Sequence, residues 1–406
     1  MKSCIAVVSI FVLLCQGFFV QELSTNKPDA AFQEMVNKVK RASFQHTLKM
    51  LSLMHSNNER NGIYGSLNFL VSFLSTMNAV GKEGKNETLI KLLNFDKFFT
   101  SFDEATNVFA NPMFQKLLTA KSVVILSKDF EVKSDYKNRF NNSPFHLYLN
   151  VDFQTKDDRE KDQQVIRNEV LKLNNTAFAD EKEMLNNFTL FFELKEEDIF
   201  NMFSYSNYTA KFAPSFRFAS AKTLEGAFHS QGSQGYASFM NNKREYNYST
   251  TDDLEGIKIP LESGDALTII LPKKNVPFGK VLEKLGYEAI DEILRKMSPK
   301  VIDLRIPKFP NSSISTKNSF FGVNGFDNYF SKNVTWKGIS DTNGLYLTQL
   351  TMANYIRFEE ETSIFERRRP PGGRQMRIIV NAEYPFVYFI HTETGICLYG
   401  AYVNYF

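Results

Sequence analysis

Apolar residues recur at helical spacing near the N-terminus and at strand-like spacing further along the chain. From Ala31 to His55, large apolar side chains return every three or four residues, which predicts an amphipathic helix. The segment 69–80 is apolar almost all round and predicts a helix buried under a sheet. Residues 122–127 and 147–153 have the composition of strands, and 157–173 predicts a charged surface helix.

The C-terminal part contrasts a charged, kinked segment with strongly apolar runs. Segment 362–377 contains Pro370-Pro371-Gly372-Gly373 among five arginines, and these are the usual marks of an exposed loop. The runs that follow, 378–380, 384–390 and 395–403, are rich in β-branched and aromatic residues. They predict buried strands joined by a turn.

Several short motifs of this chain occur together in one known family. They are Asn381-Ala-Glu-Tyr-Pro385-Phe386, Thr394-Gly395, Leu398-Tyr-Gly400 and Val403-Asn404, with Val301 to Phe309 ending in Pro307-Lys-Phe309, and Trp336-Lys-Gly338-Ile339-Ser340. In order and spacing they resemble the serpins, a superfamily of serine protease inhibitors. The resemblance covers roughly residues 30 to 406.

The resemblance implies an α+β serpin fold, a single large domain over residues 28–406. It implies three β-sheets surrounded by about eight or nine helices, with an exposed reactive-centre loop at about 360–378. Length and composition agree, because no linker interrupts the chain and 43% apolar residues, with 39 Phe and 17 Tyr, suffice for one large core.

Residues 1–20 have the pattern of a signal peptide. Lys2 supplies the positive start, Ile5 to Leu14 the apolar core, and a cleavage point falls near Gly17. This run is too short for a comfortable membrane span, and no other apolar window of about 18 residues occurs. The sequence therefore predicts a secreted, extracellular protein.

Loss of that segment removes Cys4 and Cys15 and leaves Cys397 as the single thiol. An intramolecular disulfide framework is then excluded, and the fold must be held by its core. Cys397 lies in an apolar run, which favours a buried small hydrophobe over a reactive thiol.

Glycosylation signals fit an extracellular compartment. Each candidate asparagine is followed by any residue but proline and then Ser or Thr: Asn86, Asn141, Asn174, Asn187, Asn207, Asn247, Asn311 and Asn333. Asparagine is abundant in this chain, so several of these sequons arise by chance. We expect glycan on a few of them.

Enzyme classes find no support in the sequence. There is no metalloprotease motif, no paired-cysteine spacing and no nucleophile elbow, and the five histidines are scattered singly. The net charge of +3 is too small to argue for nucleic acid or membrane partners. The sequence predicts a monomeric non-enzyme without metal or cofactor.

The position of the bait residue in the loop follows from family spacing. Counting back from Pro385 places the reactive bond between Arg374 and Gln375, and Arg377 is the fallback. Counting forward from Ser363 instead makes Met376 the residue before the bond. The two counts differ because this loop is about two residues shorter than the family's. An arginine before the bond suits a trypsin-like serine protease, whose specificity pocket holds an acidic group.

The hinge of this loop departs from the serpin pattern. Inhibitory serpins insert the loop as a new central strand after cleavage, and small uncharged residues allow it. The corresponding residues are Glu360, Glu361, Thr362, Ser363, Ile364 and Phe365, followed by charged residues and Pro370-Pro371. Buried charges and missing backbone donors oppose insertion, so covalent trapping is predicted to fail.

Two further departures concern sheet opening. The tryptophan that the family carries in this block is missing from 190–203, and Met352 replaces the usual histidine before the hinge. Three functions remain open: an inhibitor or competing substrate, a non-inhibitory carrier or interaction protein, and a serpin that binds sulfated polysaccharide. The alternative to all three is that the arginines are a solvated charge run and the loop has no dedicated partner.

Overall fold

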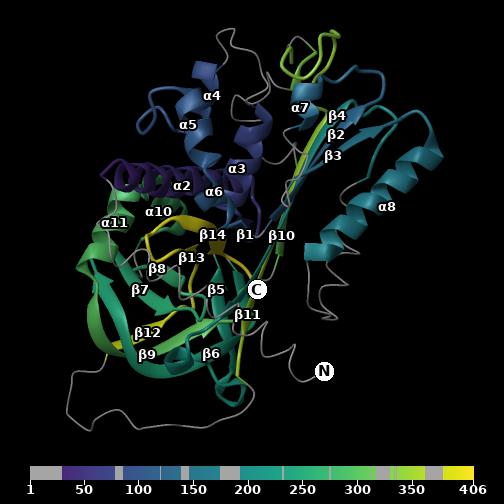
Figure 1. The fold of residues 1–406 in the computed structure, drawn as a ribbon. Coiled ribbons are helices and arrows are strands. Elements are labelled where there is room, and N and C mark those ends of the chain that lie inside the picture. The colour runs from purple at the N-terminus through teal and green to yellow at the C-terminus, as the bar shows by residue number, and fades with distance from the viewer. Residues whose placement is uncertain are drawn as a thin grey trace, which may run out of the picture.

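Figure 1 shows the fold as a computed structural model of the 406-residue chain. The structure describes residues 30–77, 86–118, 120–138, 146–173, 193–230, 233–273, 276–310, 312–316, 330–332, 334, 336–361 and 378–406. Nine α-helices and fourteen strands lie in these ranges. The strands form two sheets.

The smaller sheet has five strands in the order β10-β11-β4-β2-β3. Their bounds are β2 Ala120–Ser127, β3 His146–Val151, β4 Phe200–Lys211, β10 Ser312–Thr316 and β11 Gln349–Glu359. Strands β11 and β4 are direct parallel neighbours, paired from Gln349 and Asn201 to Glu359 and Lys211. The strands predicted at 122–127 and 147–153 correspond to β2 and β3.

The larger sheet has nine strands in the order β1-β14-β13-β8-β7-β6-β9-β12, with β5 paired to β6. Their bounds are β1 Gly62–Tyr64, β5 Leu224–Ser230, β6 Ser233–Thr250, β7 Leu254–Pro260, β8 Ala266–Pro272, β9 Ser298–Pro307, β12 Ile378–Asn381, β13 Phe386–His391 and β14 Cys397–Val403. The three predicted C-terminal strands are confirmed as β12, β13 and β14.

The expected count of three sheets becomes two among the described residues because of β6. This strand is 18 residues long. Its first part pairs with β5, its last part pairs with β7, and β9 pairs with it across the middle. One continuous hydrogen-bonded ladder therefore joins what the resemblance implied as two separate sheets.

Helices cover both sheets. Their bounds are α2 Ala30–Ser56, α3 Ser66–Met77, α4 Asn86–Leu92, α5 Phe102–Phe109, α6 Pro112–Gln115, α7 Ser134–Asn138, α8 Lys156–Leu173, α10 Phe278–Lys284 and α11 Tyr287–Lys296, with 3-10 turns η1 Pro214–Phe216 and η2 Ser220–Lys222. In Figure 1, α8 lies on one side of the smaller sheet and α3 on the other. The helices predicted at 31–55, 69–80 and 157–173 correspond to α2, α3 and α8.

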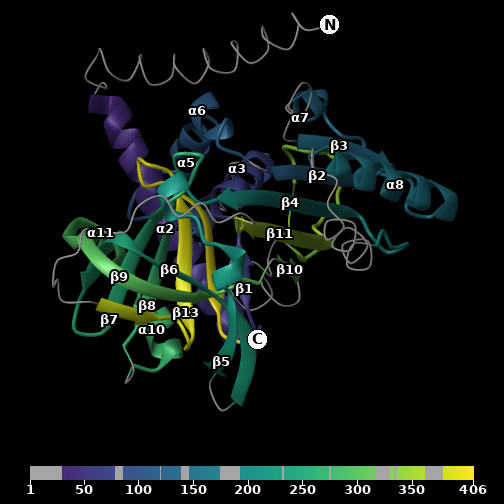
Figure 2. The same ribbon diagram turned by 90° about the horizontal axis from the view of Figure 1, so that it is seen from below.

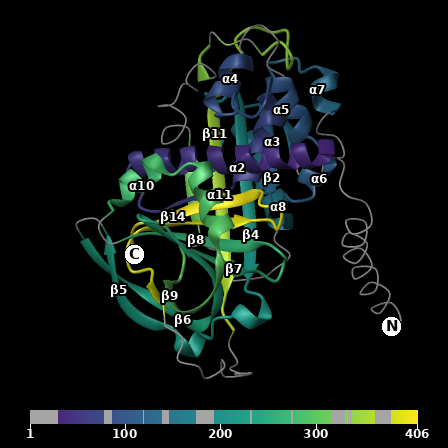
Figure 3. The ribbon, with the colours of Figure 1, turned by 90° about the vertical axis from the view of Figure 1, so that its left-hand side faces the viewer.

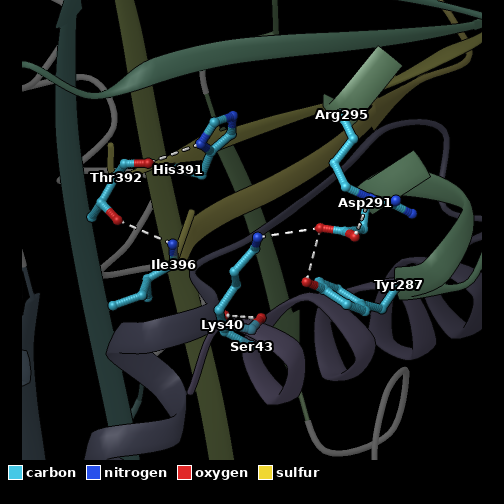
Figure 4. A network of polar contacts seen from close by, with 8 residues as sticks. All are labelled: Lys40, Ser43, Tyr287, Asp291, Arg295, His391, Thr392 and Ile396. Carbon is cyan, nitrogen blue, oxygen red and sulfur yellow. Dashed lines mark hydrogen bonds and ion pairs between the residues drawn. The ribbon is translucent and has the colours of Figure 1, made fainter. Parts of the chain in front are cut away.

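A polar network fixes α2 to α11 near the β13–β14 turn (Figure 4). Asp291 accepts hydrogen bonds from Lys40 Nζ at 3.2 Å, Tyr287 Oη at 3.1 Å and Arg295 Nε at 2.9 Å. The turn itself needs glycine, because Gly395 has φ +87° and a Cβ there would meet Lys40 Cε at 2.8 Å. The N-terminal helix is thus held against the C-terminal hairpin.

The body beneath this helix is a continuous apolar core. Cys397 is fully buried in β14, and burial raises the pKa of its thiol to about 12. The predicted small buried hydrophobe is confirmed by this position, because a thiol with so high a pKa stays protonated at neutral pH.

Candidate functional site: the boundary between β11 and β4 and the start of the loop

If the loop after β11 entered the smaller sheet as the resemblance implies, it would lie between β11 and its parallel neighbour β4. Figures 2 and 3 show β11 beside β4 and its end lying towards β6 and β9. The two strands are parallel and paired residue for residue, so no gap is open between them. Entry of another strand requires all of this ladder to separate.

Both faces of this boundary are buried. Towards α8, Ala353 and Tyr355 on β11 pack with Phe203 and Tyr205 on β4. On the opposite face, Met352, Leu350 and Ile356 join the main core. Met352, predicted to matter for sheet opening, is 2% exposed and packs as a core side chain. A strand inserted here would be buried on both sides.

Asn354 crosses the boundary with its side chain. Its Oδ1 accepts hydrogen bonds from Ser206 Oγ on β4 at 2.7 Å and from Gly65 N at 3.1 Å, and its Nδ2 donates to Ile63 O at 3.0 Å. Position 65 excludes a side chain, since a Cβ there would lie 2.6 Å from Asn354 Oδ1. One buried amide therefore ties β11 to β4 and to the segment before α3.

Ion pairs hold the hinge end of the same boundary. Lys211 on β4 pairs with Glu359 on β11 at 3.4 Å. Lys308 pairs with Glu360 at 2.6 Å, and the Thr223 hydroxyl also donates to Glu360. The Glu360 side chain is only 11% exposed, so these two contacts replace part of the hydration that its carboxylate loses on burial.

Glu361 directs the chain away from the boundary. Its N–H donates to Phe218 O at 2.8 Å, and its carbonyl accepts from Ser220 N at 3.0 Å. Its carboxylate pairs with Arg217 at 2.9 Å, and Arg217 also reaches Glu262 at 3.6 Å. The predicted hinge residues Glu360 and Glu361 are therefore brought together at a charged anchor.

An open hollow of about 420 Å³ lies at this anchor, lined by Lys211, Phe212, Arg217, Glu262, Glu359, Glu360 and Glu361. Aromatic rings pack against one another beside this hollow. Phe212 follows the end of β4, and its ring centroid lies 4.9 Å from that of Phe218 and 5.8 Å from that of Phe358. Phe309 packs on Phe358 at 4.5 Å.

Sequence reasoning did not identify these supporting residues as functional. The Pro307-Lys308-Phe309 motif carries part of the resemblance, and in the structure its lysine pairs with Glu360 while its phenylalanine packs on Phe358 near the end of β11. Arg217 lies in no motif and belongs to a turn 144 residues before its partner Glu361. The sequence signal available for Arg217 was the polar and aromatic composition of the segment directly after β4.

The far end of the loop leads into β12. Residues Ile378 to Asn381 pair in parallel with Ile302 to Arg305 of β9. The predicted bait residues Arg374, Gln375, Met376 and Arg377 lie outside the described residues, as do the hinge residues Thr362, Ser363, Ile364 and Phe365. Their roles stay predictions.

The described sequon asparagines differ in accessibility. Asn247 is exposed on β6, whereas Asn207 is half-buried in β4 opposite Tyr355. Asn86 begins α4. The others, Asn141, Asn174, Asn187, Asn311 and Asn333, lie outside the described residues.

The histidines do not gather into a site. His46, His146 and His391 are buried separately, and burial lowers their pKa values to about 3, 4 and 4. Within the described ranges, no cluster of His, Cys, Asp or Glu could hold a metal ion. Nor does any helix of those ranges have the length and apolarity to cross a membrane.

These features define a class of protein: a mixed α+β domain in which a long connection joins a central strand of one sheet to an edge strand of another. A family model described as Serpin (serine protease inhibitor) matches residues 41–405, so the chain belongs to the serpin family. Serpins are mostly protease inhibitors rather than enzymes. The predicted family and fold class are confirmed.

Curated relatives match over part of their length. An uncharacterized serpin-like protein of Thermococcus kodakarensis is 27% identical over 193 residues, covering 45% of each chain. The leukocyte elastase inhibitor of Xenopus tropicalis is 24% identical over 177 residues, 40% of this chain and 46% of the relative. These matches span less than half the length of either relative.

Solved structures agree with the fold over most of the chain. The mouse protein-Z dependent protease inhibitor has a TM-score of 0.75 at 15% identity, covering 92% of this chain and 99% of that one. Human thyroxine-binding globulin complexed with thyroxine has a TM-score of 0.73 at 13% identity, covering 91% and 98%. At these identities the likeness shows the fold alone.

Proposed function

We propose that this protein is a secreted, monomeric serpin that presents the Arg374–Gln375 bond to trypsin-like serine proteases. It acts as a competing substrate that is cleaved without covalently trapping the protease. The observation that carries the proposal is the mismatch between the buried boundary of β11 and β4 and the charged residues that would have to enter it.

The mismatch holds for either register of the inserted strand. Alternate residues of a strand face opposite sides of a sheet. If Ser363 and Phe365 face the main core, Arg367 and Arg369 follow them inward. If the other set faces inward, it comprises Ile364, Glu366, Arg368 and Pro370. Both registers place two ionised side chains on the core face.

The energetic cost of this burial is large compared with what insertion gains. Each unpaired buried ion costs several kcal/mol even after relaxation. Each hydrogen bond added to the ladder contributes about 1 kcal/mol net. Pro370 and Pro371 also lack the N–H that a central strand must donate. Insertion of residues 366–371 is therefore opposed.

Contacts at the start of the loop add to this barrier. Insertion must turn the chain back at the hinge, which breaks both backbone hydrogen bonds of Glu361 and its pair with Arg217. The Asn354 bond to Ser206 must break as well. These contacts favour the closed sheet, in which the loop stays available for cleavage.

The choice of protease rests on the arginine before the bond. A guanidinium fits a specificity pocket that holds an acidic group, as in trypsin-like enzymes. Arg377 offers a second site, and the Met376 alternative would instead suit a protease with an apolar pocket. Amino-terminal sequencing of the released fragment distinguishes these bonds.

A second candidate function is contact with a sulfated polysaccharide. The run Arg367-Arg368-Arg369 favours it, and a solved structure of protease nexin-1 with heparin shares the fold, with a TM-score of 0.70. Salt-dependent retention on a sulfated matrix, lost on replacing these three arginines with alanine, would support it. The four glutamates that line the nearby charged anchor argue against this function, because their carboxylates would repel a polyanion.

The test of the main proposal is incubation with trypsin. We expect cleavage after Arg374 and no denaturant-resistant complex at the summed mass. Arg374→Ala should prevent cleavage at this bond, whereas Arg60→Ala, at an exposed position between α2 and β1, serves as the matched control. A stable complex would overturn the argument from the hinge.

Secretion is tested separately through glycan. In protein collected from the medium, we expect glycan on Asn247, whose side chain is exposed, and none on Asn207, which lies within the smaller sheet. Glycosidase treatment followed by peptide mass measurement identifies the occupied sites. Absence of the protein from the medium would contradict secretion.

A further inference from the structure

A hollow of about 700 Å³ lies away from the hinge, between the β6–β7 turn and the helices α10 and α11. Its lining comes from residues 250–254 of the turn, from Val276 and Pro277, and from one face of each helix. We call it the helix-pair hollow. Its volume falls within the range of small-molecule sites, about 300–1,000 Å³, so the side chains around it decide what it could hold.

The two faces of α11 separate this hollow from the polar network of Figure 4. Tyr287, Asp291 and Arg295 recur every four residues, and the first and the last both donate hydrogen bonds to Asp291. Ala289 and Ile293 line the hollow instead. Residues four apart share one face of a helix, so these two lie on another face. The network and the hollow are therefore distinct features of the same helix.

The floor of the hollow is apolar and fixed to the larger sheet. Four of its side chains are at most 9% exposed: Leu254, Val281, Leu285 and Ile293. Ile293 packs directly on β7, since a Cβ at Gly256 would lie 2.4 Å from its Cγ2. Its carbonyl accepts a hydrogen bond from Ser249 Oγ at 2.8 Å. The floor is thus formed in advance and suits an apolar group.

The β6–β7 turn forms a wall whose backbone is held in place. Thr251 N donates to Leu254 O at 2.8 Å, and Leu254 N donates to Thr251 Oγ1 at 3.1 Å. Lys273 N donates to Asp253 O at 2.8 Å, and Lys273 Nζ donates to Thr251 O. Asp252 and Asp253 are both exposed. Their carboxylates give this side of the hollow a negative charge.

Helix α10 places two positive charges on the rim. Lys280 and Lys284 line the hollow one turn apart, and both are exposed. Within the described part of the chain, neither lysine forms an ion pair, whereas Lys296 on α11 pairs with Glu292 at 2.5 Å. Like charges four residues apart on a helix repel each other. An anionic group bound beside both lysines would relieve this repulsion.

The charges of the rim therefore differ between its two elements, positive on α10 and negative on the turn. A ligand with a single negative charge would also meet the two aspartates, and one with a single positive charge would meet the two lysines. A ligand with one charge of each sign satisfies both elements. A second hollow, of about 190 Å³, shares Val276 and Pro277 with the first, so an extended apolar chain has room to continue.

We propose that the helix-pair hollow binds a zwitterionic amphiphile, a molecule with one alkyl chain, one anionic group and one cationic group. The anionic group lies beside Lys280 and Lys284, the cationic group beside Asp252 and Asp253, and the alkyl chain on the apolar floor. Burial of the chain supplies most of the affinity, and the charges supply the selectivity. This site is independent of the loop and of the proposed function.

The experiment titrates the intact chain with dodecylphosphocholine, kept below the concentration at which it forms micelles, in a calorimeter. We expect saturable binding of one molecule per chain. Dodecanoate and dodecyltrimethylammonium have alkyl chains of the same length but a single charge, and both should bind about tenfold more weakly. Equal affinity for the three probes, or no saturable binding of the first, would overturn the proposal.

Charge variants test the two sides of the rim separately. Lys280→Gln with Lys284→Gln should weaken dodecylphosphocholine about tenfold and shift the preference towards dodecyltrimethylammonium. Asp252→Asn with Asp253→Asn should shift it towards dodecanoate. A merely structural effect would not move these preferences in opposite directions. Lys156→Gln with Lys161→Gln, two exposed positions on α8, is the matched control and should change nothing.

Filling the floor tests where the ligand lies. Ala289 is half-buried at the hollow, so Ala289→Trp should occupy the place of the alkyl chain and weaken all three probes at least about tenfold. Ala289→Leu serves if the larger side chain prevents folding. Unchanged affinity in a folded variant would contradict this location. Trypsin cleavage after Arg374 should not differ between these variants and the unchanged chain, so failure of either proposal leaves the other standing.

Discussion

The two ends of the loop are held in opposite ways. At its start, Glu359, Glu360 and Glu361 are fixed by ion pairs to Lys211, Lys308 and Arg217. At its far end, β12 is held by a parallel ladder to β9 and by burial of Val380. Serpin inhibition requires the start of the loop to enter the smaller sheet, so the charged end decides whether this chain can trap a protease.

This difference separates recognition from trapping. The residues before the far end concern which protease approaches and cuts. The charged start and the residues after it concern what happens next. Under the proposed function, the chain keeps recognition and lacks trapping, because charged residues and prolines follow the hinge.

Replacing residues 362–371 with a hinge of Gly, Thr and Ala should have the largest effect. The new hinge brings no charge or proline into the boundary, so insertion should follow cleavage. Each added hydrogen bond contributes about 1 kcal/mol, so we expect the cleaved variant to melt more than about 10 °C above its intact form. Calorimetry before and after trypsin treatment measures this difference. Equal melting temperatures would show that the closed sheet, and not the composition of the hinge, prevents insertion.

Asn354→Leu should destabilise the closed sheet itself. The change leaves Gly65 N and Ile63 O without their side-chain partner in a buried place. We expect a loss of about 2–4 kcal/mol in the free energy of unfolding, measured by urea titration. Asn37→Ala on the exposed side of α2 is the control. An unchanged midpoint would show that Asn354 does not hold β11 to β4.

Val380→Ala tests the far end of the loop. Val380 is 2% exposed, whereas its neighbour Ile379 is 63% exposed. We expect Val380→Ala to cost about 2 kcal/mol and Ile379→Thr to cost less than about 0.5 kcal/mol. The same urea titration checks both, and equal costs would contradict the assignment of one face to the core.

Arg217→Ala should have the smallest effect on stability. Arg217 and Glu361 are 35% and 39% exposed, and such pairs contribute about 0.2–1 kcal/mol. The loss should shrink further at high salt. A loss above about 2 kcal/mol that salt does not change would show that this pair carries buried structure, rather than steering the chain at the surface.

The sequence predicted the local elements well and the cross-chain contacts poorly. Apolar periodicity located α2 and charge patterning located α8, because both are local signals. The partnership of β11 with β4 and the Asn354 network join segments far apart in the chain, which no periodicity reports. The continuous β6 was also missed, since its charged middle, Lys243 to Glu245, reads as a break between strands.

The candidate site divides in the same way. Glu360 and Glu361 were predicted as hinge residues from family spacing, and the structure gives them partners. Arg217 and Lys308 could not be predicted as those partners, because their role depends on where turns meet after folding. The bait residues Arg374 to Arg377 rest on sequence spacing alone.

The most direct test of the central claim is the melting temperature of the unaltered protein before and after cleavage at Arg374–Gln375. If charged and proline residues keep the loop out of the smaller sheet, the two melting temperatures should agree within about 2 °C. A rise of more than about 10 °C on cleavage would mean that the loop inserts between β11 and β4, and would contradict the account.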